Sequence, residues 1–199
     1  MRVTVIDYKA GNLTSVLKAL RHLGADSLVT DSDVSLIDSA ERLILPGVGH
    51  FAATQRLDVA GLTPGIRAAV ERGVPFLGIC VGMQWLYAGS TEAPARPGLA
   101  HFSESCTRFP EGQEKVPHVG WNSLEVRDSS RLLSGVGHGE YVYFTHSYKA
   151  PVSADTAASA YYIETFAAAV ERGNVMGVQF HPEKSGATGL KILHNFLEM

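Results

Sequence analysis

The sequence has few of the residues that mark several large classes of protein. Only two of its 199 residues are cysteine, too few for the disulfide framework of a small secreted domain. It has no C-x-x-C pair, and its histidines are scattered, so we expect no metal site. Charged residues make up 19% of the chain and the net charge is −3, which leaves no basic excess for binding nucleic acid or an anionic membrane.

Long apolar runs are also missing. The longest stretch, residues 74–88, is too short to span a bilayer and contains Gln84. At the amino terminus, Asp7 interrupts the chain before the apolar core of a secretion signal could form. We therefore expect a cytoplasmic protein without a membrane segment, and no motif calls for a cofactor.

What the sequence does have is enough apolar residues, 45% of the total, to build a substantial core. We expect a single domain over residues 1–199, because no linker or repeat divides the chain. In the first half, short apolar runs alternate with segments of helical periodicity that end at glycines, which predicts a parallel sheet with helices on both faces. Strands are predicted at residues 2–7, 27–30, 41–45 and 74–80, and helices at 12–23 and 63–73, with Thr63 as the N-cap of the second helix.

The second half changes character after about residue 99, because helical periodicity weakens and short strand-like runs take its place. Residues 166–170 and 175–180 predict a hairpin, although a helix at 165–172 is an alternative because alanine is compatible with both. A last helix is predicted at 189–199. The predicted fold is thus α/β: three layers, a mostly parallel sheet, and added antiparallel strands in the C-terminal half. Those strands are expected at residues 99–105, 116–126, 141–145 and 157–163.

Cys80 lies in a G-x-C-x-G motif between an apolar strand and a helical pattern. A sharp strand-to-helix turn places its corner residue at the carboxyl end of the sheet in strained backbone angles, and Gly78 and Gly82 allow the neighbouring backbone to pass closely. A thiol at a helix N-terminus is also favoured as thiolate. The pattern predicts a nucleophile, with a buried, inert cysteine as the alternative. Cys106 has no visible partner and is expected to be structural.

His181 and Glu183 follow the last predicted strand. On an extended segment, residues two apart face the same way, so Glu183 could orient the imidazole of His181 while that ring moves protons to and from a nucleophile. The alternative is a surface turn with unrelated polar groups. Together with Cys80 the pattern favours a catalytic triad.

Pro46-Gly47-Val48-Gly49 ends the third predicted strand. Its glycines would let backbone amides turn toward an oxyanion near Cys80. Gly47-x-Gly49-x-x-Ala52 is also compatible with a dinucleotide-binding fingerprint. That interpretation is weaker because the motif follows the third strand and lacks the acidic residue expected about twenty positions later.

Residues 78–84 and 179–185 together resemble the class I, or triad-type, glutamine amidotransferases. More narrowly, the chain resembles the glutaminase subunits of imidazole glycerol phosphate synthases. This narrower resemblance rests on residues 7–12, 46–49 and 115–122, of which the last carries a Val-Pro-His-x-Gly-Trp-Asn motif. It also includes Tyr143-Phe144-Thr145-His146-Ser147-Tyr148. Lys9 departs from the family pattern, which has glycine at that place.

The resemblance implies an α/β glutaminase that hydrolyses L-glutamine through Cys80, His181 and Glu183. It implies an oxyanion hole from the amides of Val48 and Val81. Substrate contacts are implied for Gly49, Gln84, Thr145, His146, Ser147 and Tyr148.

The resemblance further implies a partner, a cyclase subunit with a (β/α)8 barrel that forms a heterodimer with this chain and uses the ammonia in histidine biosynthesis. The candidate interface or tunnel residues are Asn12, Trp121, Tyr143 and Lys184. Three alternatives remain: the glutaminase subunit of another synthase, a different cysteine hydrolase, and a scaffold that kept the fold but lost turnover. The intact Cys80, His181 and Glu183 oppose the last.

Overall fold

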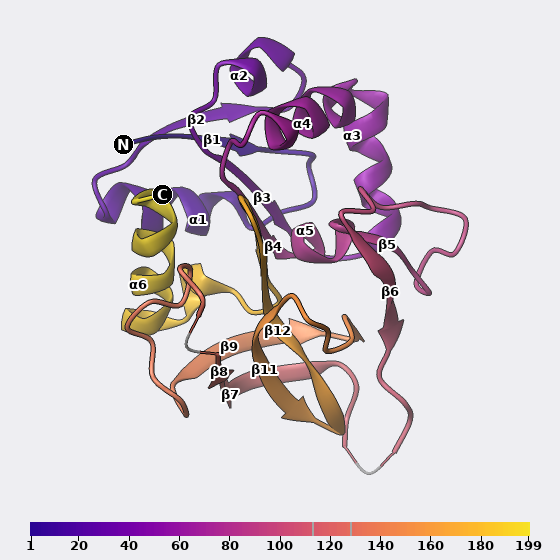
Figure 1. Ribbon diagram of the computed structural model, residues 1–199. Helices are drawn as coiled ribbons and strands as arrows, with labels where there is room; N and C mark the ends of the chain where they lie inside the picture. The colour runs from indigo at the N-terminus through magenta and orange to yellow at the C-terminus, as the bar shows by residue number, and fades with distance from the viewer. Residues whose placement is uncertain (113, 128) are drawn as a thin grey trace.

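The central feature of the fold is a twisted sheet that crosses the whole molecule (Figure 1). The computed structural model describes residues 1–112, 114–127 and 129–199. Within these residues, the largest sheet has eight strands in the order β2-β1-β3-β4-β13-β12-β11-β8. They are β1 (Arg2–Ile6), β2 (Asp26–Thr30), β3 (Leu43–Gly47), β4 (Phe76–Cys80), β8 (Glu125–Val126), β11 (Thr156–Tyr162), β12 (Glu164–Arg172) and β13 (Val175–Val178).

The first part of this sheet is parallel and is covered on both faces, as the sequence predicted. β2, β1, β3, β4 and β13 run parallel to one another. Alternate side chains of a strand point to opposite faces, and each face has its own buried core. Val3 and Val5 pack in the same core as α1 (Leu13–His22) and α6 (Gly186–Leu197).

The opposite face is covered by α2 (Val34–Asp38), α3 (Gln55–Val59) and α4 (Leu62–Glu71). Figure 1 shows these helices on the other side of the sheet from α1 and α6. Leu43 and Leu45 of β3 contribute to this second core. The three-layer α/β prediction is therefore confirmed.

The C-terminal half adds antiparallel strands, also as predicted. β12 pairs with β13 through Arg172 and Val175, so the predicted hairpin forms and the alternative helix at 165–172 does not. The reason is burial: Phe166 to Val170 is buried at every position, which suits a central strand covered on both faces better than an amphipathic helix. The strand continues further than predicted, so the turn narrows to Gly173-Asn174.

Two smaller sheets complete the structure. One has the order β10-β6-β5, and the other pairs β7 with β9. Neither β5 nor the short helix before it, α5 (Val81–Trp85), had bounds predicted from the sequence. The bounds are β5 (Tyr87–Ser90), β6 (Phe102–Arg108), β7 (His118–Ser123), β9 (Tyr141–His146) and β10 (Tyr148–Lys149). None of the helices in the described part of the chain has the length and apolar character needed to span a lipid bilayer.

The predicted start of α4 was wrong by two residues. The helix begins at Leu62, and its N-cap is Gly61 in the left-handed region at φ 71°. Thr63 therefore lies inside the helix, where its hydroxyl donates to the Asp58 carboxylate of α3. The N-cap position that the sequence interpretation had assigned to Thr63 belongs to Gly61.

The fold places a severe steric demand on the chain at Gly82. A Cβ on this residue would lie 1.9 Å from the carbonyl oxygen of Leu45. We predict that Gly82→Ala lowers the free energy of unfolding by about 3 kcal/mol or more, because backbone on both sides of the contact must move. Gly137→Ala is the control, since its nearest atom would be 3.7 Å away. Urea unfolding of both variants checks this, and equal stability would contradict the packing described.

Candidate active site

Cys80 forms the corner between β4 and α5 with backbone angles φ 54° and ψ −109°. A non-glycine residue in this region is strained by roughly 1–3 kcal/mol, so the surrounding structure must impose the conformation. Two glycines make it possible: a Cβ on Gly78 would lie 2.5 Å from the Gly82 oxygen, and Gly82 itself packs on Leu45. The predicted strained corner is thus present, and the fold sets where the thiol lies.

His181 and Glu183 meet beside this thiol. The Nδ1 atom of His181 lies 2.9 Å from Oε1 of Glu183, and both side chains are buried. Burial alone would lower the pKa of His181, but the neighbouring Cys80 thiol and the Glu183 carboxylate outweigh it and raise the pKa to about 9. The ring is therefore an imidazolium at neutral pH, with a cation beside the sulfur and a carboxylate behind the ring.

The backbone between His181 and Glu183 differs from the sequence expectation. Instead of an extended segment, residues Pro182–Lys184 form a 3-10 turn. The Nδ1 atom of His181 is hydrogen-bonded to Glu183, while its Nε2 has no hydrogen-bond partner among the described residues. The nitrogen that remains available is thus the one that could exchange protons with a reacting group.

Asn12 also belongs to this group of residues. Its Nδ2 donates to Oε1 of Glu183 at 3.2 Å, so it supports the carboxylate from behind. Its predicted place at a partner interface stays a prediction, and the contact with Glu183 was not predicted from the sequence. The contact joins positions 171 residues apart, which no local pattern in the sequence could reveal.

Two buried glutamine side chains form a hydrogen-bonded chain that ends at the thiol. Gln179 Nε2 lies 3.6 Å from Cys80 Sγ, and its Oε1 accepts from Gln84 Nε2 at 3.0 Å. Gln84 also donates to the Tyr148 carbonyl at 3.0 Å, which ties α5 to β10. Gln179 was not predicted from the sequence as a residue of the site. Its position at the end of a buried strand, two residues before His181, was the available signal.

A small cavity opens onto Cys80. Its volume is about 220 Å³, below the roughly 300–1,000 Å³ typical of sites for drug-sized ligands. Glu92 and Pro117 also line it, and neither was predicted from the sequence. All six predicted substrate residues border it: Gly49, Gln84, Thr145, His146, Ser147 and Tyr148.

The side chain of His146 is nevertheless already engaged inside the protein. Its Nδ1 lies 2.9 Å from the Tyr148 carbonyl, and its Nε2 lies 3.0 Å from Nδ1 of His118. Burial lowers the pKa of His146 to about 3 and that of His118 to about 4, so both rings are neutral at pH 7. Alternation along β9 turns the ring inward, so in this conformation His146 borders the cavity while both of its ring nitrogens are paired inside the protein.

The amide of Val48 points away from the thiol. Its N–H donates to the Ala10 carbonyl at 2.8 Å, and Val48 lies outside the left-handed region, whereas Gly49 has φ 91°. The predicted oxyanion donor is therefore unavailable in this conformation. Val81, the other predicted donor, is the first residue of α5, so its N–H has no acceptor within the helix.

This geometry agrees with what the sequence matches among known proteins. The model of the glutamine amidotransferase class-I family matches residues 4–199. The chain is 44% identical to the imidazole glycerol phosphate synthase subunit HisH of Methanosarcina acetivorans, covering 100% of this chain and 98% of that protein. It is 46% identical to the subunit of the same name from Caldanaerobacter subterraneus, covering 99% and 98%.

The chain belongs to the class-I glutamine amidotransferases, and within them to the HisH group. Solved structures share the fold. A structure described as a glutamine amidotransferase has a TM-score of 0.77 at 21% identity over 98% of this chain and 97% of that one. The structure of PurLQS from Thermotoga maritima has a TM-score of 0.75 at 22% identity, over 99% of this chain and 97% of the matched chain.

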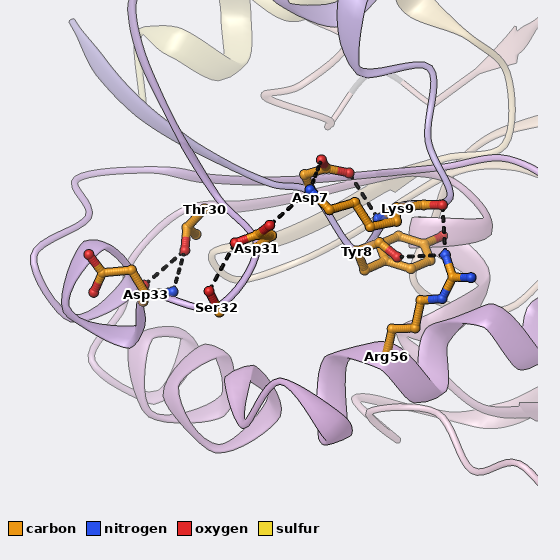
Figure 2. A network of polar contacts seen from close by, with 8 residues as sticks. All are labelled: Asp7, Tyr8, Lys9, Thr30, Asp31, Ser32, Asp33 and Arg56. Atoms are coloured by element: carbon orange, nitrogen blue, oxygen red, sulfur yellow. Dashed lines mark hydrogen bonds and ion pairs between the residues drawn. The ribbon is translucent and has the colours of Figure 1, made fainter.

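The amidotransferase has an unusual residue in the turn that holds Val48. Lys9 takes φ 61°, the left-handed region that glycine adopts more easily. Its Nζ forms ion pairs with Asp7 at 3.0 Å and Asp31 at 2.8 Å. Figure 2 shows this network, and it also shows Arg56 donating to the Lys9 carbonyl. The turn therefore forms without the family's glycine.

The other three predicted interface residues of the amidotransferase do lie together. Trp121 of β7 is 55% exposed, and its ring centroid is 6.1 Å from that of Tyr143 on β9. The Lys184 Nζ lies 5.9 Å from the Tyr143 ring. Because His181 N–H donates to the Tyr143 carbonyl at 2.9 Å, this surface adjoins the candidate triad.

The raised pKa of His181 predicts the pH profile of the amidotransferase. kcat/KM for glutamine should fall on the alkaline side near pH 9, where the imidazolium loses its proton. Glu183→Gln should move this limb to lower pH, because the carboxylate no longer stabilises the imidazolium. Steady-state rates from about pH 6 to 10 check this. An alkaline limb at the same pH in both proteins would contradict the role of Glu183.

Proposed function

We propose that this chain is the glutaminase subunit of an imidazole glycerol phosphate synthase. It hydrolyses L-glutamine to glutamate and ammonia, acts as a single glutaminase domain in the cytoplasm, and passes ammonia to a cyclase subunit in histidine biosynthesis. The observation that carries the proposal is the strained Cys80 beside the His181–Glu183 pair, at the mouth of a small cavity with a carboxylate on its wall.

The cavity matches the chemistry of an amino acid. Glu92 lines it, and the backbone N–H of Phe51 donates to its Oε2 at 2.7 Å, so this carboxylate is fixed in place. A fixed anion in a small site is suited to an α-ammonium group. Glutamine bound in this way would direct its side-chain amide toward Cys80.

The residues then divide the reaction between them. Cys80 Sγ attacks the amide carbon, and the His181 imidazolium gives its proton to the leaving nitrogen, which departs as ammonia. The neutral ring next takes a proton from water, which attacks the thioester and releases glutamate and the thiolate. Glu183 holds the ring in the required tautomer and stabilises its charge but transfers no proton.

The oxyanion that forms in these steps needs a donor that the described conformation withholds. Reversal of the Gly47–Val48 peptide would turn the Val48 N–H from the Ala10 carbonyl toward the thiol. The closed form is the described conformation, with the Val48 N–H on the Ala10 carbonyl, and the open form is the one with this peptide reversed. Gly47 tolerates the change, whereas Val48 resists positive φ, so the open form carries strain of roughly 1–3 kcal/mol. The closed form therefore dominates in the isolated chain.

Contacts with a docked partner could supply the free energy that the open form needs relative to the closed form. The surface formed by Trp121, Tyr143 and Lys184 combines an exposed and a half-buried aromatic ring with a cation, a composition typical of the centre of protein interfaces. It adjoins the candidate triad through the Tyr143 carbonyl. We assign it to a cyclase with a (β/α)8 barrel, docked as a heterodimer so that ammonia does not escape to solvent.

Stimulation by the partner is the first test. The isolated chain should hydrolyse glutamine very slowly. Adding the cyclase and its nucleotide substrate should raise kcat by about a hundredfold or more with a smaller effect on KM, because an oxyanion donor acts mainly in the transition state. Steady-state glutaminase assays on the chain alone, with cyclase, and with cyclase plus ligand measure this. Full activity of the chain alone would reject both the closed form and the need for a partner.

Removal of the nucleophile is the second test. Cys80→Ala should abolish glutamine hydrolysis by several orders of magnitude while the chain still folds and binds the cyclase. The complex should still make imidazole glycerol phosphate when ammonium salt replaces glutamine, because only the source of ammonia is lost. Cys106→Ala is the control and should keep glutaminase activity, since Cys106 lies in the other core. Retention of more than about a tenth of the rate by Cys80→Ala would refute the assignment.

A further inference from the structure

The phenol of Tyr8 is a buried polar group that the proposed reaction leaves without a role. Tyr8 is 3% exposed, and its hydroxyl has no hydrogen-bond partner among the described residues. Burial raises the pKa of Tyr8, so the group stays protonated and can donate. Most buried polar side chains are hydrogen-bonded, and one that is not requires an explanation.

The hydroxyl lies against the peptide that controls the oxyanion donor. A Cβ built on Gly47 would be 2.2 Å from it, and the same point is 2.9 Å from the Gly82 nitrogen. Tyr8 is also close enough to Cys80 for the sulfur to influence its pKa. The free donor is thus located between Gly47 and the first turn of α5.

The backbone around Tyr8 is held in place by charged groups. Arg56 of α3 donates to the Lys9 carbonyl at 2.8 Å and to the Tyr8 carbonyl at 3.5 Å. Figure 2 shows Arg56 beside these carbonyls and the side chains of Asp7 and Asp31 around Lys9. The turn that positions the Tyr8 ring is therefore the one whose Ala10 carbonyl holds the Val48 N–H.

Reversal of the Gly47–Val48 peptide leaves the carbonyl of Gly47, the residue that the Tyr8 hydroxyl contacts, in need of a donor. In a trans peptide the C=O and N–H point in opposite directions. When the Val48 N–H leaves the Ala10 carbonyl, the Gly47 carbonyl turns toward the side it vacated. Two carbonyls would then face each other, and a buried carbonyl without a donor is costly.

We propose that Tyr8 is a positioning residue that stabilises the open form of the Gly47–Val48 peptide by donating its hydroxyl to the Gly47 carbonyl after the peptide reverses. The hydroxyl is unpartnered in the closed form because its acceptor is turned away. This inference rests on the proposed function, since it concerns the oxyanion step of glutamine hydrolysis.

Tyr8→Phe tests the inference in the complex with the cyclase and its nucleotide substrate. We expect kcat for glutamine to fall by at least about fivefold, the effect of losing one neutral hydrogen bond. KM should change by less than about twofold, because the bond forms only on the way to the transition state. The Tm of the isolated chain should be equal or higher, because the closed form loses only an unsatisfied hydroxyl.

Tyr87→Phe is the matched control. Tyr87 is fully buried and its hydroxyl is also unpartnered within the described ranges, but its titratable neighbours include Cys106 and Glu104 rather than Cys80. It should leave kcat unchanged. The inference is overturned if Tyr8→Phe keeps the wild-type kcat, if both variants lose rate equally, or if the loss comes with a lower Tm. Absence of cyclase stimulation in the wild type would instead refute the proposed function and this inference with it.

Discussion

Where β4 turns into α5, Gly82 packs against the carbonyl oxygen of Leu45 so closely that no side chain fits between them. This contact draws the first turn of the helix onto β3, and Cys80 must then take positive φ to connect the two elements. The sheet order places β3 and β13 on either side of β4. Residues 46–49 at the end of β3 and the His181 turn after β13 consequently reach the thiol from opposite sides.

Electrostatics at the site follows from this arrangement. Burial would leave His181 neutral, yet a sulfur on one side and the Glu183 carboxylate on the other keep it charged by raising its pKa. His146 lies in the same interior without a carboxylate, and its pKa moves in the opposite direction. The partner of each imidazole, rather than its depth, thus decides whether the ring is charged or neutral at pH 7. The same interior leaves Tyr8 uncharged, with no hydroxyl partner among the described residues.

Much of the fold and of the candidate site could be predicted from the sequence, because both depend in large part on local patterns of residues. The α/β fold followed from hydrophobic periodicity, and the Cys80 corner followed from two glycines at fixed spacing. What could not be predicted depended on long-range contacts or on peptide orientation. Asn12 reaches Glu183 across the chain, the inward turn of His146 depends on the register of β7 and β9, and the direction of the Val48 amide depends on the Ala10 carbonyl. Gly61 was missed as a cap because Thr63-Pro64 gave a stronger local signal.

The central claim is that the strained corner makes Cys80 the nucleophile toward glutamine. Peptide mapping by mass spectrometry tests it most directly, after the complex with the cyclase is incubated with a diazoketone analogue of glutamine that alkylates a reacting thiol. We expect one label, on Cys80, and protection from it by excess glutamine. A label on Cys106, or an unlabelled Cys80 in a complex that turns over glutamine, would contradict it.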